Sequence, residues 1–160
     1  MEIAVLALGC FWGPEKKYGQ LEGIYRTEVG YCGGNSPNTN YREVCTGTTN
    51  HAEAVKLEFD PKVISYDEII RKFFEFHDPT TLNSQGPDFG TQYRSEIFYL
   101  NDEQKRVAQK IIDEENVRLS GRVVTKLSEL KNYCTAEEYH QKYLDKRSVS
   151  YTHLTLPTKA

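Results

Sequence analysis

The hydrophobic positions at the start of the chain predict a strand, a helix and a second strand. Residues 2 to 8, EIAVLAL, are apolar at both alternating positions, which is typical of a central strand buried on both faces. Pro14 suits the first turn of a helix, and we expect that helix from about residue 12 to residue 20. Residues 23 to 31, GIYRTEVGY, follow as a second strand.

The rest of the chain continues this alternation of strands and helices. Ser65 with Glu68, and Thr135 with Glu138, each have the spacing of a capping box at the start of a helix. The expected elements are a strand over residues 52–60, a helix over 66–77, a strand over 93–100, a helix from 102 to about 119, a short strand over 122–127 and a last helix over 139–144. This order predicts an α/β (α+β) domain, a two-layer sandwich in which helices pack on a mixed sheet.

Two long loops interrupt the pattern. Residues 32 to 51 are dense in Gly, Asn, Thr and Pro, and a second irregular stretch follows over residues 78 to 92. Loops of this length in a compact domain are usually functional or disordered. The chain of 160 residues shows no repeat and no linker, and it is long enough to bury the core of a single domain.

Charge and hydropathy exclude several classes of partner. The chain carries 20 basic and 23 acidic residues without a long basic run, so neither nucleic acid nor an anionic membrane is expected to bind it. No apolar stretch approaches the roughly 20 residues of a membrane-spanning helix. The apolar start lacks the basic region of a signal peptide, which favours a first strand instead.

The four cysteines are Cys10, Cys32, Cys45 and Cys134. They form no CxxC pair and no Cys/His cluster with the spacing of a zinc site, so no metal is expected. Without a secretion signal we expect a reducing compartment, the cytoplasm, in which free cysteines are buried bystanders or reactive groups. We expect the protein to be a monomer.

Cys10 lies where the first strand gives way to the first helix, beside Phe11 and Trp12, the single tryptophan of the chain. Two interpretations are open. The three residues form either a corner of the core, in which the cysteine is a small hydrophobe, or a thiol site with an aromatic wall. In the second case the helix N-terminus favours the Cys10 thiolate, and the two rings make an apolar box for a small uncharged group such as a methyl.

Glu53 heads the apolar face of the strand over residues 52–60, because it alternates with Val55, Leu57 and Phe59. A carboxyl group desolvated at that position has a raised pKa and can act as an acid near neutral pH. The alternative is that Glu53 reaches solvent at the end of the strand.

Five further residues are weaker candidates. Tyr41, Tyr93 and Asp88 lie in or beside the two long loops, but the chain has eleven tyrosines, and tyrosines in loops often serve packing alone. His51 and His77 have no spacing typical of metal ligands, so local hydrogen bonding is the expected role of each.

Four segments taken together resemble the peptide methionine sulfoxide reductase A family: GCFWGPE, NYREVCTGTTNHAEAVKLEFDP, HDPTTLNSQGPDFGTQYRS and AEEYHQKYL. They stand in the family's order with compatible spacing, over residues 2 to about 146. The resemblance implies a two-layer α/β fold around a ferredoxin-like βαβ core. It also implies thiol-dependent reduction of the S epimer of methionine sulfoxide, free or in proteins, a task that two enzymes divide by epimer.

The resemblance assigns the reacting groups. Cys10 matches the family's nucleophile and Glu53 the acid that protonates the sulfoxide oxygen, while Phe11 and Trp12 match the aromatic residues that hold the methyl group. Attack by Cys10 on the sulfoxide sulfur releases methionine and leaves a cysteine sulfenic acid. A second thiol then condenses with that acid.

The resemblance also assigns the groups around the substrate. Tyr41 and Tyr93 match the tyrosines that hydrogen-bond the oxygen, and Asp88 matches the acceptor of a substrate amide. The family needs no metal and no organic cofactor, and thioredoxin is the implied reductant.

Two departures from the family pattern stand out. Ser84 replaces the arginine that is common in the family's Asn-Arg-Gln-Gly, which is a peripheral change. The final residues, SVSYTHLTLPTKA, have neither the family's character nor a helical or strand period. We therefore expect a catalytic domain over residues 1–147 and a non-native or disordered tail over 148–160.

The thiol that resolves the sulfenic acid is open. Relatives often carry it in a Gly-Tyr-Cys-His-like tail, which this sequence lacks. Cys134 is our preferred substitute, because its place before the last expected helix favours a thiolate. Cys32 and an external thiol are the alternatives, and Cys45 is expected to be a buried packing residue.

Other classes of protein remain to be distinguished. A cysteine hydrolase needs a histidine base near Cys10, and nothing in the sequence places one. A cysteine peroxidase needs no aromatic box for a methyl group. A binding domain with structural cysteines and tyrosine-rich loops accounts for the composition but not for the four matched segments.

Overall fold

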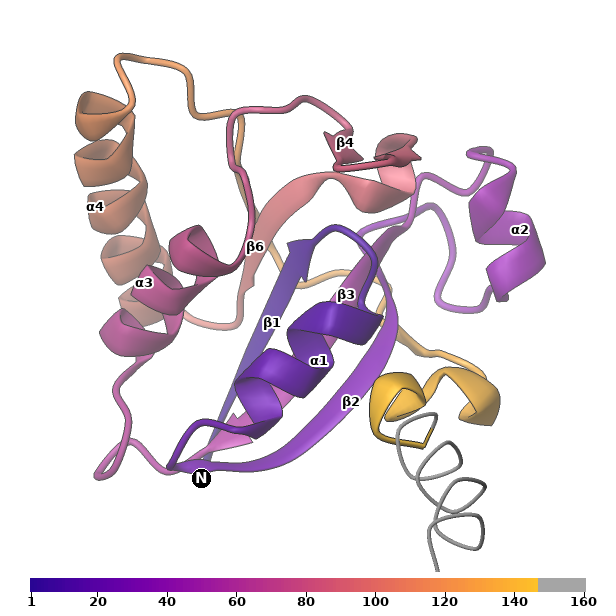
Figure 1. Cartoon of the computed structure of the whole chain (residues 1–160), viewed down its shortest axis with the longest axis horizontal. Helices are drawn as coiled ribbons and strands as arrows, with labels where there is room; N and C mark the ends of the chain where they lie inside the picture. The colour runs from indigo at the N-terminus through magenta and orange to yellow at the C-terminus, as the bar shows by residue number, and fades with distance from the viewer. Residues whose placement is uncertain (147–160) are drawn as a thin grey trace, which may run out of the picture.

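The computed structural model describes residues 1–146. A six-stranded mixed sheet forms the centre of the fold, in the order β7-β6-β1-β3-β2-β8 (Figure 1). Its strands are β1 (Glu2–Leu8), β2 (Ile24–Cys32), β3 (Ala52–Phe59), β6 (Ser95–Tyr99), β7 (Lys126–Glu129) and β8 (Cys134–Thr135). All neighbours are antiparallel except β6 and β7. The tail that we expect over residues 148–160 lies outside the described residues.

Three long helices lie on the sheet: α1 (Trp12–Gly19), α3 (Tyr66–Phe76) and α4 (Asp102–Arg118). Strand β3 lies between β1 and β2 and pairs with both, so α1 crosses over β3 in a split βαβ unit. The helix α3 then connects β3 to β6, which lies on the other side of β1. This arrangement is ferredoxin-like, and it confirms the predicted two-layer α/β class. The helix α4 connects β6 to the parallel strand β7.

Strand β1 is buried on both faces, as its sequence predicts. Leu6 belongs to the main core under the three helices, whereas Val5 belongs to a second apolar cluster on the opposite face. Val55 and Phe59 of β3 also face the main core, which confirms the alternation expected in that strand. The helices therefore cover one face of the sheet, and the segment around Leu130 covers part of the other.

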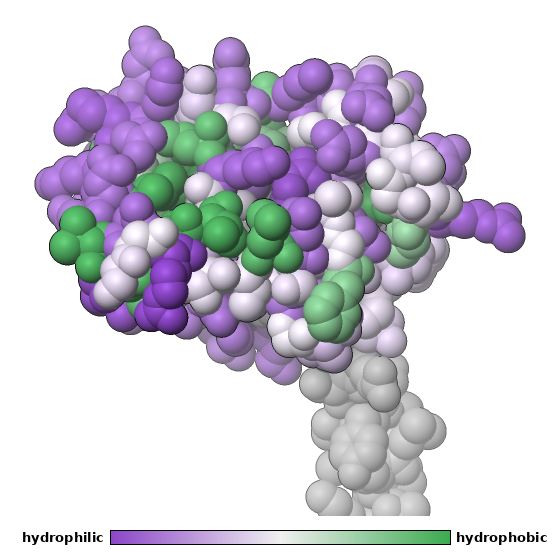
Figure 2. Space-filling model, turned by 90° about the horizontal axis from the view of Figure 1, so that it is seen from above, coloured by the Kyte–Doolittle hydropathy of each residue, from purple (hydrophilic) through white to green (hydrophobic). Residues whose placement is uncertain are grey.

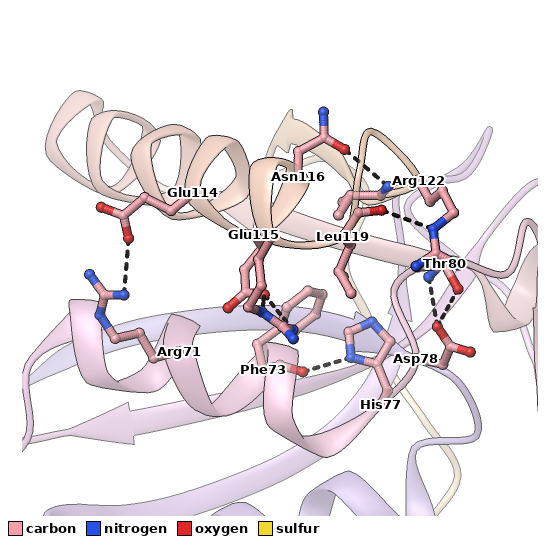
Figure 3. Close-up of polar contacts among 12 residues, drawn as sticks. Arg71, Phe73, His77, Asp78, Thr80, Glu114, Glu115, Asn116, Leu119 and Arg122 are labelled. Carbon is pink, nitrogen blue, oxygen red and sulfur yellow. Dashed lines mark hydrogen bonds and ion pairs between the residues drawn. The ribbon is translucent and has the colours of Figure 1, made fainter.

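Polar contacts hold both ends of α3, and Figure 3 shows those at its C-terminal end and between Arg71 and α4. Ser65 accepts a hydrogen bond from the Glu68 backbone at 3.1 Å, which confirms the predicted cap. Arg71 pairs with Glu114 of α4 at 3.1 Å, but both side chains are exposed, so the pair adds little stability. At the other end, the Nδ1 atom of His77 lies 2.6 Å from the Phe73 carbonyl oxygen. The start of the second long loop is thereby fixed.

Both long loops contain short elements that the sequence analysis missed. The first loop includes α2 (Tyr41–Cys45), whose N-cap Asn40 accepts a hydrogen bond from the Glu43 backbone at 2.9 Å. The second loop forms a hairpin of β4 (Ser84–Gln85) and β5 (Asp88–Phe89), followed by the 3₁₀ turn Thr91–Tyr93. Elements of two to five residues are too short for a periodic pattern.

The C-terminal end differs from the prediction. Thr135 does not cap a helix, because its backbone pairs with Gly30 at the edge of the sheet and its hydroxyl donates to Glu28. The expected last helix is a 3₁₀ turn, Glu138–His140, with a helical turn at 143–146. The short strand expected over residues 122–127 is β7, which begins four residues later, at Lys126.

Candidate active site

Cys10 occupies the turn between the C-terminal end of β1 and α1, at the end of the molecule where β4 and α2 also lie (Figure 1). The turn requires Gly9, which has φ +97°, and a Cβ atom there would lie 2.9 Å from the Gln85 side chain. The β4–β5 hairpin thus packs directly against the cysteine turn. Phe11, the next residue, is the N-cap of α1.

Glu53 lies beside this turn. In the sheet it pairs with Tyr31 of the neighbouring strand β2, and it is 1% exposed. Its Oε1 atom accepts a hydrogen bond from the Phe11 backbone at 3.2 Å. Its carboxyl group also hydrogen-bonds the thiol of Cys10. Burial raises the pKa of Glu53 to about 8, and the nearby Asp88 carboxylate acts in the same direction. The predicted buried acid is confirmed, and the solvent-exposed alternative is wrong.

Cys10 does not have the lowered pKa that its place before a helix suggested. Burial raises the pKa of its thiol to about 12, and the charges of Glu53 and Asp88 add to the shift. The backbone N–H of Trp12 opposes it, but one hydrogen bond at the start of an eight-residue helix does not offset desolvation. At neutral pH the site therefore holds a thiol and a carboxylic acid, both protonated.

Two tyrosines and one aspartate surround this pair. Tyr41 opens α2 and Tyr93 ends the 3₁₀ turn after β5, so each long loop contributes one. The pKa of Tyr41 is raised to about 12, first by a hydrogen bond with Cys45 and then by burial, while burial and Glu53 raise that of Tyr93. Both hydroxyls remain hydrogen-bond donors at neutral pH. Asp88 is half-buried in β5, and its charge contributes to the raised pKa values of Cys10, Glu53 and Tyr93.

Phe11 and Trp12 form an aromatic wall whose orientation depends on the C-terminal segment. The Trp12 indole N–H donates to Nδ1 of His140 at 3.1 Å, and the indole stacks on Tyr143 with ring centres 3.8 Å apart. The Phe11 ring is 5.7 Å from that of Tyr31 and 5.2 Å from that of His140. Burial lowers the pKa of His140, so its imidazole is neutral and can accept this bond.

The C-terminal segment is itself anchored to the sheet. Gln141 accepts a hydrogen bond from the Val29 backbone at 2.9 Å and donates back to the carbonyl of the same residue at 2.8 Å. The buried Glu15 of α1 accepts from the Lys142 backbone at 2.7 Å. Residues 140 to 143 belong to the matched segment AEEYHQKYL. The sequence analysis assigned no role to them, because their contacts join positions more than 100 residues apart.

The other cysteines lie at different depths. Cys32 is 0% exposed in β2, where its thiol donates to the Lys131 carbonyl at 3.4 Å. Cys134 is half-buried in β8 rather than at a helix N-terminus, and its thiol donates to the Thr39 carbonyl at 3.5 Å. Cys45 is exposed, so its prediction as a buried packing residue is wrong. The short helix α2 buries Val44 and turns Cys45 outward.

The two histidines considered above have local partners. His51 Nε2 lies 2.8 Å from the Ser36 carbonyl oxygen, and His77 lies between Phe73 and Ser95. Within residues 1–146, no group of three or more histidine, cysteine and acidic residues could hold a metal ion. None of the helices described there is long and apolar enough to cross a membrane.

The contacts of Cys10 restrict the chemistry. Its hydrogen-bond partners are a carboxylic acid and a backbone N–H, whereas a hydrolase requires a base that removes the thiol proton. A protonated acid beside a thiol instead suits attack on an atom whose leaving oxygen must take up a proton. The fold and the site thus define a cysteine-dependent oxidoreductase of the two-layer α/β class.

Comparisons with known proteins agree with this class. The family model described as peptide methionine sulfoxide reductase matches residues 2–160. The protein from Pelagibacter ubique named peptide methionine sulfoxide reductase MsrA is 71% identical over 147 residues, which cover 92% of this chain and 100% of that one. The protein of the same name from Saccharolobus solfataricus is 47% identical, with 99% and 90% of the two chains covered.

Solved structures show the same relationship. The reduced form of Mxr1 from Saccharomyces cerevisiae superposes with a TM-score of 0.86 at 42% identity, over 91% of this chain and 84% of that one. Methionine sulfoxide reductase A of Corynebacterium diphtheriae gives a TM-score of 0.87 at 39% identity, over 91% and 74%. The chain belongs to the peptide methionine sulfoxide reductase A family.

Proposed function

We propose that the protein reduces the S epimer of methionine sulfoxide, free or within proteins, with Cys10 as nucleophile and Glu53 as proton donor. The observation that carries the proposal is the contact between the Cys10 thiol and a buried carboxyl group with a pKa near 8, next to an aromatic wall. Repair of oxidised proteins in the cytoplasm is the setting in which we expect this activity.

Substrate binding places the two sides of the sulfoxide in different surroundings. The methyl group lies against Phe11 and Trp12, and the oxygen faces Glu53 and the hydroxyls of Tyr41 and Tyr93. Asp88 accepts a hydrogen bond from an amide of the substrate. With methyl, oxygen and side chain each held by a different group, only one epimer presents its sulfur to Cys10.

The reaction transfers one oxygen atom and two electrons. Glu53 gives its proton to the sulfoxide oxygen and receives the proton that the Cys10 thiol loses as its sulfur attacks. The S–O bond of the substrate breaks, the substrate sulfur is reduced to the thioether, and Cys10 is oxidised to a sulfenic acid. Tyr41 and Tyr93 donate hydrogen bonds to the oxygen, which stabilises the polar transition state.

The resting state, in which Cys10 and Glu53 are both protonated, fits this sequence of steps. A thiolate beside a carboxylate would place two like charges in a desolvated site, which Cys10 and Glu53 avoid by keeping both protons. The thiol loses its proton only after the sulfoxide has taken one from Glu53. We infer that the nucleophile is generated by bound substrate.

A comparison of epimers tests the function. We expect the protein to convert the S-sulfoxide of N-acetylmethionine to the thioether with dithiothreitol as reductant, and to leave the R-sulfoxide unchanged, measured by chiral chromatography. Consumption of hydrogen peroxide without reduction of either sulfoxide would instead identify a peroxidase.

Recycling requires a second thiol and then an external reductant. The sulfenic acid of Cys10 condenses with a thiol to give a disulfide and water, and a dithiol reduces that disulfide. A solved structure titled Mxr1 from Saccharomyces cerevisiae in complex with Trx2 has a TM-score of 0.64 to this chain at 27% identity, over 89% and 84% of the two chains. That similarity supports thioredoxin as the reductant here.

Cys134 remains the cysteine that we propose for the intramolecular step. It pairs with Tyr31, which pairs with Glu53, so all three side chains lie on the same face of the sheet. Cys32 pairs with Ala52 and points to the opposite face. Two strand spacings, about 10 Å, separate Cys134 from Glu53. Disulfide formation needs the Cα atoms of Cys10 and Cys134 within about 7 Å, so we infer that β8 leaves the sheet edge before the two residues meet.

Because β8 has to detach, we expect slow resolution. Dithiothreitol should support turnover much better than thioredoxin, and peptide mapping after one turnover should find a Cys10–Cys134 disulfide. A persistent sulfenic acid or a bridge from Cys10 to Cys32 would show that Cys134 is the wrong thiol.

A further inference from the structure

The short helix α2 carries Tyr41, yet it places little of its own surface in the core. Val44 is its one buried side chain, while Arg42, Glu43 and Cys45 are exposed. Seen from above, mostly hydrophilic and weakly polar residues, coloured purple and white, cover the end of the molecule where Figure 1 draws α2 (Figure 2). A helix of five residues is not stable alone. Contacts from other segments are therefore needed to orient Tyr41.

A carboxylate from the segment after β8 supplies one of these contacts. Glu137 Oε2 accepts a hydrogen bond from the Tyr41 backbone at 2.9 Å, and Glu137 Oε1 accepts one from the Tyr31 hydroxyl at 2.7 Å. Burial raises the pKa of Glu137, but the hydrogen bonds from Tyr41 and Tyr31 oppose burial, and the pKa lies below its usual value. At neutral pH the group is a carboxylate, which accepts stronger hydrogen bonds than a neutral oxygen.

The two partners of Glu137 belong to different sides of the cysteine site. Tyr41 carries one of the two hydroxyls that we place at the sulfoxide oxygen. Tyr31 lies on the side of the methyl group, because its ring is 5.7 Å from that of Phe11, and it pairs with Glu53 in the sheet. One carboxylate thus joins the helix of an oxygen-binding tyrosine to the strand that lies beside the aromatic wall and the acid.

The other contacts of α2 restrict its orientation less. Asn40 caps the helix through the Glu43 backbone, a bond within the same loop that cannot orient α2 relative to the sheet. Val44 packs in the apolar cluster around Phe11, and the Tyr41 ring lies with its centre 4.7 Å from that of His140. Apolar packing is not directional, whereas a hydrogen bond is.

We propose that Glu137 is a positioning residue for sulfoxide reduction, whose carboxylate holds Tyr41 where the tyrosine hydroxyl meets the sulfoxide oxygen. The inference rests on the proposed function, and it adds a residue to which the matched segment AEEYHQKYL had given no role. Glu137 takes no part in the transfer of oxygen or protons, so its effect on the rate passes through Tyr41. A displacement of about 1 Å in a reacting group can cost about 10²-fold in rate.

A double-mutant cycle tests this role. The readout is the rate at which N-acetylmethionine forms in a single turnover of its S-sulfoxide, so that recycling of Cys10 does not contribute. Glu137→Ala should lower this rate by about tenfold, a part of the 10²–10³-fold that one transition-state donor contributes. In the Tyr41→Phe background, where the donor is already absent, Glu137→Ala should lower the rate by less than about twofold.

Two further variants separate geometry from charge and guard against loss of the fold. Glu137→Gln should stay within about threefold of the original rate, because the carboxamide oxygen can still accept from the Tyr41 backbone. If Glu137→Ala does not fold, Glu137→Asp takes its place in the cycle, since its carboxylate is one CH₂ group farther from Tyr41.

Hydrogen exchange followed by mass spectrometry measures the positioning without reference to activity. Glu137→Ala removes the acceptor of the Tyr41 N–H, so the peptide that contains α2 should exchange faster than in the original protein.

Glu28→Ala is the matched control. Glu28 also accepts a hydrogen bond from a tyrosine hydroxyl, that of Tyr133 at 2.8 Å, and a second from the Thr135 hydroxyl at 3.1 Å, but neither partner belongs to α2. Exchange in α2 should be unchanged in this variant. Any loss of rate that it causes should be the same in the original and the Tyr41→Phe backgrounds.

Three results would overturn the proposal: an unchanged rate in Glu137→Ala, a loss of equal size with and without the Tyr41 hydroxyl, or equally faster exchange of α2 in Glu28→Ala. The last would show a general loosening of the fold around β8. Failure of the original protein to reduce the S-sulfoxide would contradict the proposed function instead.

Discussion

Cys10→Ser is expected to abolish sulfoxide reduction. A serine hydroxyl gives up its proton far less readily than a thiol and is a poor nucleophile toward sulfur, so no oxygen can be taken from the substrate. Turnover with dithiothreitol and N-acetylmethionine S-sulfoxide measures the effect, and a single-turnover assay shows whether any methionine forms at all. Activity equal to that of the original protein would exclude Cys10 as the nucleophile.

Cys45→Ser is the control for this variant. Cys45 is an exposed thiol, so its replacement tests whether the loss of any accessible cysteine lowers activity. We expect this variant to retain turnover, because the introduced serine hydroxyl can still hydrogen-bond Tyr41, and we expect both variants to keep the circular dichroism spectrum and melting temperature of the original chain. If only Cys10→Ser loses the fold, alkylation with iodoacetamide in the Cys45→Ser chain, with the modification of Cys10 mapped by mass spectrometry, gives the test without a mutation at Cys10.

Glu53→Gln should lower kcat by roughly 10²–10⁴-fold, the usual contribution of one positioned proton donor. Glutamine keeps an oxygen that can accept the hydrogen bond from the Phe11 backbone, but it has no proton to give. The alkylation of Cys10 by iodoacetamide should continue, since the thiol remains. A fall in kcat of less than about fivefold, well under that range, would show that Glu53 is not the acid.

The pH dependence of the original protein gives a second measure of Glu53. Donation requires the protonated carboxyl group, and its pKa is about 8, so kcat/KM should fall as the pH rises through that value. The thiol of Cys10, with a pKa raised to about 12, does not titrate in this range. In Glu53→Gln the decline near pH 8 should be absent.

The same pKa has a consequence for stability. Glu53 titrates near 4.5 when unfolded and near 8 in the fold, so the folded state binds this proton more tightly. Its contribution to the free energy of unfolding is fully present below pH 4.5 and is lost as the pH rises toward 8. Chemical denaturation at several pH values should show that Glu53→Gln weakens this dependence. A merely catalytic defect would not alter it.

Local pattern was enough to predict the parts of the fold that repeat a period over many residues. The apolar run of β1, the alternation in β3 and the capped helix α3 each depend on side chains that are neighbours in sequence. The alternation in β3 also predicted that Glu53 lies on the buried face, since side-chain direction in a strand has a period of two. Resemblance then placed Cys10 and Glu53 in one site.

Tertiary contacts decided the rest. The pKa of Cys10 depends on the sum of burial, the neighbouring carboxyl groups and one backbone N–H, and the sequence displayed only the helix start. Thr135 has the spacing of a helix cap, yet pairing with Gly30 across about 100 residues of sequence makes it a strand. The orientation of Trp12 is set by His140 and Tyr143, a contact that no local period encodes. Sequence by itself determined the buried positions of the long strands β1 and β3, because burial in such elements follows local periodicity. Only the folded chain determined how those elements set the charge, orientation and neighbours of the reactive thiol, because these depend on groups brought together from distant segments.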